Sequence, residues 1–229
     1  MSCAGIGAAL LSDVPQNDRL PAFDCARILN GIAERNPGKM FGLATIDPTD
    51  YTSGTVTDIG RQLPGIVGIR INSGRCGVAL DDLKMLDPII SELLETGMPL
   101  FAEVTASAFD LTHPFRLEKL LAARPELRVA AIHMGGASRP DFCKDVFSVA
   151  RRHDNLWLIG SANYWQRVLQ AINEVGSERV MFGSASPEKC FMVSAVAAYK
   201  AMFAVENLPE SVCENVLSVN LKRFIEKKC

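Results

Sequence analysis

Short apolar runs recur seven times along the chain, and segments with helical spacing separate them. A continuous apolar run of this length is typical of a parallel strand that helices cover on both faces. In the intervening segment 83–94, for example, apolar residues repeat at three and four positions, and Gly97 follows as a helix end. We predict strands at 6–11, 40–46, 66–71, 100–104, 128–133, 156–159 and 179–182. Further helices are predicted around 117–121, 146–150, 168–175, 192–204 and 210–226.

This alternation allows either a (β/α) barrel or an open, doubly wound sheet. No glycine-rich phosphate-binding pattern follows the first run, which disfavours a nucleotide-binding sheet. Polar residues such as Arg70, Glu103 and His133 stand where apolar runs stop. In a barrel these strand ends converge on one mouth, where active sites lie. We therefore predict one α/β domain over 1–229, a distorted (β/α) TIM-like barrel of seven parallel strands.

The N-terminal segment leads directly into a core strand, so we expect this barrel to lack its first strand. Such a gap leaves two exposed sheet edges, which proteins normally cover. We expect a C-terminal helix or a partner subunit to close it. We also expect a homo-oligomer.

The composition excludes several classes of protein. With 48% hydrophobic and 22% charged residues, the chain is neither disordered nor fibrous. Its net charge of −2 gives no electrostatic footprint for nucleic acid, and no apolar run approaches the length of a membrane span. The seven cysteines are irregularly spaced and include no CxxC pair, which favours a reduced, cytoplasmic protein.

Five segments carry recognisable motifs: RNPGKMFGLATIDP (35–48), GIVGIRIN (65–72), RPELRVAAIHMGG (124–136), RVMFGSASP (179–187) and NLKRF (220–224). In the same order, they resemble motifs of the amidohydrolase-related family. The first resembles P-x-R-F-x-G-x-A-x-V-D-P, the second a strand ending in G-I-K-L-H, and the third R-x-P-x-L followed by H-x-G-G. The fourth is similar to R-x-x-F-G-S-D-x-P, and the last to the closing N-A-x-R-x-F helix.

The resemblance implies a distorted TIM barrel that usually binds zinc or a similar divalent ion. Family members hydrolyse amides and lactones or decarboxylate small acids. Their ligands are a His-x-His after the first strand, one histidine after the fifth, one after the sixth and an aspartate after the eighth. Here the His-x-His has no counterpart, Glu103 replaces the fifth-strand histidine, and Ala185 replaces the aspartate. Only His133 remains.

Zinc sites need three or four nitrogen, sulfur or oxygen ligands. His133 and Glu103 supply two, and Asp13 or Asp47 would complete only an unorthodox site. We therefore expect no zinc and no other cofactor. A metal, if bound, would be held through His133 and Glu103.

Each remaining polar residue has a functional and a structural interpretation. His133 would be a general acid or base, or a structural histidine that ties strand ends together. Glu103 would accept a proton or, as we favour, form an ion pair with Arg70 across adjacent strands. Arg70 would instead hold a substrate carboxylate through its planar fork of donors.

Three further polar residues lie at strand ends. Asn72 stands where some family members carry a second histidine. Asn163 would donate hydrogen bonds to a bound compound or simply contact water. Ser184 would bind a carboxylate or phosphate, or cap the turn before the next helix. We expect Arg70, Glu103 and His133 to line one pocket, with Ser184 nearby.

Two functions fit these residues. One is a hydrolase, or a decarboxylase-like lyase, that acts on a small carboxylate or lactone without the family's metal; its catalytic residues would be His133 and Glu103. The other is a non-catalytic binding or assembly subunit that kept the barrel and lost the metal site. A longer natural chain would restore a strand but would not restore the ligands at Glu103 and Ala185.

Overall fold

The computed structural model describes residues 5–12, 20–137, 139–186 and 191–226. Its strands form one parallel sheet in which the order in space follows the order in the chain. The predicted distorted (β/α) barrel with seven parallel strands is therefore confirmed. The strands are β1 (Ala9–Ser12), β2 (Met40–Thr45), β3 (Ile66–Ile71), β4 (Leu100–Glu103), β5 (Val129–Ile132), β6 (Leu156–Ile159) and β7 (Val180–Met181).

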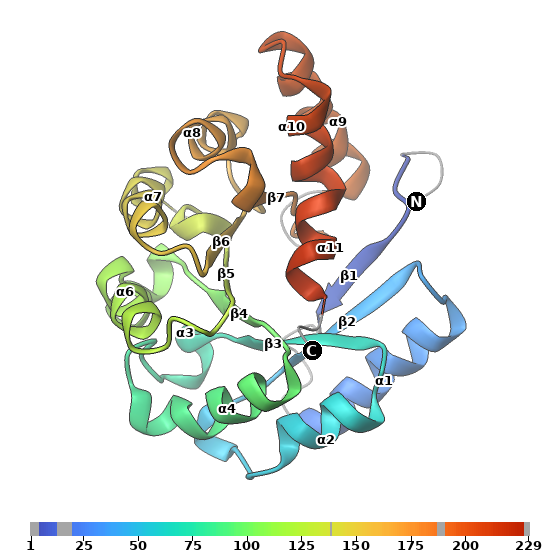
Figure 1. The fold of residues 1–229 in the computed structure, drawn as a ribbon, viewed down its shortest axis with the longest axis vertical. Helices are drawn as coiled ribbons and strands as arrows, with labels where there is room; N and C mark the ends of the chain where they lie inside the picture. The colour runs from blue at the N-terminus through green and yellow to red at the C-terminus, as the bar shows by residue number, and fades with distance from the viewer. Residues whose placement is uncertain (1–4, 13–19, 138, 187–190, 227–229) are drawn as a thin grey trace.

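Helices follow most strands and surround the outer side of the arc that the strands form (Figure 1). They are α1 (Ala22–Arg35), α2 (Thr55–Gln62), α3 (Ser73–Cys76), α4 (Leu83–Thr96), α5 (Phe109–Thr112), α6 (Pro114–Ala123), α7 (Cys143–Arg152) and α8 (Trp165–Val175). The C-terminal part contains α9 (Met192–Val205), α10 (Glu210–Glu214), the π-helical turn η7 (Asn215–Val219) and α11 (Asn220–Ile225). Strands β3 and β6 have the predicted bounds, whereas β1 begins later than predicted.

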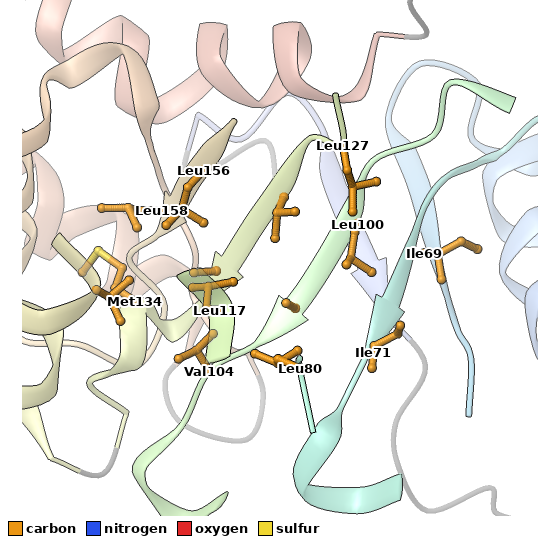
Figure 2. Close-up of a cluster of buried hydrophobic side chains, with 14 of the residues drawn as sticks. Ile69, Ile71, Leu80, Leu100, Val104, Leu117, Leu127, Met134, Leu156 and Leu158 are labelled. Carbon is orange, nitrogen blue, oxygen red and sulfur yellow. The ribbon is translucent and has the colours of Figure 1, made fainter. Parts of the chain in front are cut away.

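Side chains alternate between the two faces of the sheet, as the twofold repeat of a strand requires. On β4, Leu100 and Ala102 belong to the large core between sheet and helices, while Phe101 belongs to a smaller cluster on the inner face. Figure 2 shows Leu100 with Ile69 of β3 and Leu158 of β6 in the large core. The helices therefore cover the outer face, and the inner face has a core of its own.

The inner face is filled by the C-terminal helix. Phe224 of α11 is fully buried, and its ring lies 5.2 Å from the ring of Phe101 and 5.4 Å from that of Trp157 on β6. Leu10 of β1 and Leu221 of α11 are partly buried and pack against the same cluster. Within the described chain β1 and β7 do not pair with each other, and Figure 1 shows α11 running between them. The expected closing element is therefore the C-terminal helix.

Hydrogen bonds join the C-terminal helical segment to the chain that follows β7 and to the segments that precede β4 and β5. The Phe182 N–H donates to the carbonyl of Val216 in η7 at 2.8 Å. Arg128, just before β5, donates to the carbonyl groups of Phe224, of Glu226 (2.8 Å) and of Gly97 (2.6 Å). Because Gly97 and Arg128 precede β4 and β5, the end of α11 lies at the amino-terminal end of the strands. The polar residues at the strand ends lie at the opposite, carboxyl-terminal end of the barrel.

No helix in the described ranges is both long enough and apolar enough to cross a bilayer.

Candidate functional site

Arg70 and Glu103 lie on the inner face of the sheet. Arg70 is paired in register with Phe101, which belongs to the inner cluster, and its neighbours Ile69 and Ile71 belong to the outer core. Glu103 is paired with Ile132, which also packs against the inner cluster. Both polar side chains therefore project into the curl of the sheet, above the apolar layer that Phe101 and Phe224 form.

These two residues form an ion pair that is largely shielded from water. Arg70 Nη2 donates to Glu103 Oε2, and the two side chains are 12% and 15% exposed. Asn72 Nδ2 donates to the same carboxylate oxygen at 3.0 Å, and Arg70 Nη1 donates to Ser12 Oγ at 3.3 Å. Together they form a polar network that spans β1, β3 and β4. We call these four residues, Ser12, Arg70, Asn72 and Glu103, the arginine network.

The His133 side chain contacts Ser161 of the segment after β6. His133 opens the short 3-10 turn η4 (His133–Gly135) after β5, and it has a left-handed backbone with φ of 67°. Its Nδ1 atom lies 2.8 Å from Ser161 Oγ and 3.2 Å from the Ser161 carbonyl oxygen, just beyond β6. A left-handed backbone outside glycine is uncommon and tends to occur at functional sites.

Asn163 holds this turn in place. Its Nδ2 donates to the carbonyl of His133 at 2.6 Å and to that of Ser161 at 2.9 Å. Its Oδ1 accepts a hydrogen bond from the buried Cys143 thiol at 3.2 Å. Burial raises the pKa of Cys143 to about 12, so the thiol stays protonated and donates rather than acting as a nucleophile. We call His133, Ser161, Asn163 and Cys143 the histidine cluster.

The other candidate residues make local contacts. Ser184 Oγ accepts the N–H of Ser186 at 3.2 Å within its own turn. Asp47 accepts the N–H of Thr49 at 2.8 Å and begins a 3-10 turn. Asp13 lies outside the described residues.

The predicted site thus falls into two groups at the carboxyl ends of neighbouring strands. Arg70, Asn72 and Glu103 lie together, and His133 and Asn163 lie together. Glu103 contacts Arg70, and His133 contacts Ser161, which the sequence analysis did not single out. The sequence signal for Ser161 is its place at the end of an apolar strand, in Gly160-Ser161-Ala162.

A cavity of about 600 Å³ opens beside the histidine cluster, between the segments that follow β5 and β6. Its walls are Asp141, Tyr164, Gln166 and Arg167. Arg167 is already paired with Asp141 at 3.0 Å. Neither the arginine network nor the histidine cluster lines this cavity.

The family of the chain follows from its sequence along most of its length. The amidohydrolase family model matches residues 12–220. The chain belongs to the amidohydrolase family. No curated protein matches its sequence.

Solved structures share the fold of this amidohydrolase at low sequence identity. A 5-carboxyvanillate decarboxylase from Novosphingobium aromaticivorans, complexed with manganese and 4-hydroxy-3-methoxy-5-nitrobenzoic acid, is 20% identical with a TM-score of 0.76; the match covers 97% of this chain and 77% of that one. A 2,6-dihydroxybenzoate decarboxylase from Rhizobium is 20% identical with a TM-score of 0.73, over 98% and 85% of the two chains. A probable 2-pyrone-4,6-dicarboxylic acid hydrolase from Acinetobacter baumannii, with citric acid bound, is 16% identical with a TM-score of 0.68, over 98% and 85%.

One of these structures of similar fold holds manganese, so the described residues of this amidohydrolase are compared with the ligand set that a metal needs. Across the described ranges, no three His, Cys, Asp or Glu side chains gather closely enough to bind an ion. The Glu103 carboxylate is engaged by a guanidinium, which is itself a cation. A divalent ion needs several anionic or neutral lone-pair donors, and a bound guanidinium repels it. The described residues therefore do not fit a metal centre of the usual family type.

Proposed function

We propose that this amidohydrolase is an enzyme that acts on a small carboxylate or lactone, by hydrolysis or decarboxylation, without the family's metal. Arg70 is the anchor for the carboxylate of the compound, and Glu103, to which Asn72 donates a hydrogen bond, orients its guanidinium. His133 is the acid or base, Asn163 holds the turn that carries it, and Ser184 contributes a polar contact at the mouth. The proteins of similar fold support the substrate class, because each is named for a small carboxylate or lactone or holds a small carboxylate.

The observation that carries this proposal is a guanidinium on the inner face of the barrel, close to the carboxyl ends of the strands. A guanidinium matches a carboxylate in both charge and geometry, and it remains charged at every physiological pH. It supplies a fixed positive charge without a metal.

The proton needed for either reaction is assigned to His133. In hydrolysis, water attacks the acyl carbon while His133 takes its proton; the acyl–oxygen bond then breaks, and the proton passes to the departing oxygen. In decarboxylation, the carbon–carboxyl bond breaks, carbon dioxide leaves, and His133 supplies the proton that the carbon takes up. An imidazole suits both roles because it changes charge near neutral pH.

The ion pair also favours a second candidate function. Glu103 already supplies Arg70 with a carboxylate partner inside the protein. A non-catalytic binding or assembly subunit would keep this pair as structure and would not exchange it for a ligand. The two candidates differ in one property, which is whether an external carboxylate reaches Arg70.

A thermal-shift screen of small dicarboxylates, aromatic carboxylates and lactones tests this difference. A compound present at about ten times its Kd should stabilise the protein by about 1.4 kcal/mol, or about 3–5 °C for a chain of this length. Arg70→Ala should abolish the shift. Arg61→Ala, which removes a guanidinium from the exposed pair with Glu95, should retain it.

An Arg70→Met/Glu103→Leu variant repeats the test in a protein whose inner face has no unpaired charge. Stabilisation that depends on Arg70 supports the enzyme. Equal shifts in all variants, or none with any compound, would contradict carboxylate anchoring and favour the binding subunit.

A further inference from the structure

Ser161 presents two oxygen atoms to the same ring nitrogen of His133. Its hydroxyl Oγ lies 2.8 Å from His133 Nδ1, and its carbonyl oxygen lies 3.2 Å from the same atom. A carbonyl oxygen only accepts hydrogen bonds. Both contacts are therefore favourable only when Nδ1 carries the proton, because a bare nitrogen lone pair would face the carbonyl lone pairs.

The surroundings hold this arrangement rigidly. Ser161 is 4% exposed, so its oxygens have little access to water as an alternative partner. Asn163 bridges the carbonyl groups of His133 and Ser161 at 2.6 and 2.9 Å. The left-handed backbone at His133, with φ of 67°, and at Met134, with φ of 48°, turns the imidazole toward Ser161 instead of along the strand. The orientation of the His133 ring is therefore set both by the backbone at His133 and by the hydrogen bonds around it.

We propose that Ser161 is a positioning residue that holds neutral His133 as the Nδ1–H tautomer, so that Nε2 is the nitrogen that takes up and returns the proton. This inference rests on the proposed function for the use of Nε2, but not for the tautomer itself. The hydrogen bond at one ring nitrogen decides which nitrogen is the base. A general base with the wrong tautomer has no lone pair to offer, even when its position is correct.

A second histidine of the same chain is expected to adopt the opposite tautomer. His113, before α6, accepts the backbone N–H of Phe115 at its Nδ1 atom at 3.1 Å. An accepting Nδ1 carries no proton, so neutral His113 is the Nε2–H tautomer. The protein has three histidines, and the third is His153, beside Glu118. The imidazole signals of the three histidines should therefore include both tautomers, Nδ1–H at His133 and Nε2–H at His113.

Long-range ¹H–¹⁵N correlation spectra of the imidazole rings test this directly. The spectra are recorded at about pH 8.5, above the usual imidazole titration, and assigned by replacing each histidine in turn with glutamine. We expect the Nδ1–H pattern for His133 and the Nε2–H pattern for His113. Ser161→Ala removes the hydroxyl, which can accept from a protonated Nδ1 or donate to a bare one, and leaves the carbonyl oxygen in place. The Nδ1–H pattern should therefore remain dominant at His133 in this variant.

The matched control is Ser148→Ala, which removes a serine hydroxyl that contacts Arg152 on α7. It should leave all three patterns unchanged. An Nε2–H pattern for His133, in the wild type or in Ser161→Ala, would overturn the assignment. Because the spectra need no substrate, this failure is separate from a failure of carboxylates to bind at Arg70, which overturns the proposed function alone.

Discussion

Replacing Arg70 with alanine should destabilise the fold by about 3–5 kcal/mol, because it leaves the Glu103 carboxylate buried without its cation. Asn72 would remain as its hydrogen-bond donor, but one amide does not neutralise a charge. Replacing both residues in Arg70→Met/Glu103→Leu should give a protein about as stable as the wild type or more stable, since apolar side chains of similar size suit the inner face. Urea unfolding of the three proteins measures these differences.

The control for this comparison is Arg61→Ala, whose partner Glu95 is exposed to water; its stability should change little. If Arg70→Ala is as stable as the wild type, the Glu103 carboxylate does not depend on Arg70 for its charge to be tolerated inside the barrel. If the double variant is instead as unstable as Arg70→Ala, the loss comes from packing and not from charge.

Phe224→Ala should also cost about 3–5 kcal/mol, the usual range for a large aromatic side chain removed from a core. Phe224 is fully buried, and it packs edge-on against Phe101 and beside Trp157. The inner cluster has few other residues that could move into the space, so the cavity should stay open. Thermal and urea unfolding both report this loss.

Phe115→Ala is the matched comparison, because Phe115 is 64% exposed at the start of α6. We expect a change of less than about 1 kcal/mol for it. A similar loss in both variants would indicate a general aromatic effect. A small loss in Phe224→Ala would mean that α11 does not stabilise the inner face of the barrel.

Much of the fold could be predicted because parallel strands that are buried on both faces consist of continuous apolar residues. Strands β3 and β6 have the bounds that the sequence predicts, and the other strands overlap their predicted ranges. Helix α1 was not delimited, and its residues explain why. Asn30 is buried in the middle of α1, where it accepts the Gly65 N–H at 2.8 Å, and Gly31 follows it. A polar residue and a glycine in the middle of a helix interrupt the apolar repeat that predicts the helix, and both lower its helix propensity.

The site was less predictable because its geometry depends on contacts between strands. The position of Arg70 and Glu103 at neighbouring strand ends was enough to favour an ion pair, which the structure contains. The role of His133 as the residue that contacts Ser161 depends on a left-handed backbone, which no local pattern predicts for a histidine followed by methionine. The C-terminal segment was predicted as one helix, and the structure divides it by the π-helical turn η7.

We propose that a guanidinium provides the cation in the mouth of this amidohydrolase. The most direct test is metal analysis of the purified protein after incubation with Mn²⁺ or Zn²⁺ and removal of the excess. Glu103 is paired with Arg70, and the described residues offer no set of three ligands, so we expect well below one equivalent of either ion. One equivalent of metal that is retained by the wild type and lost in His133→Ala would contradict the account.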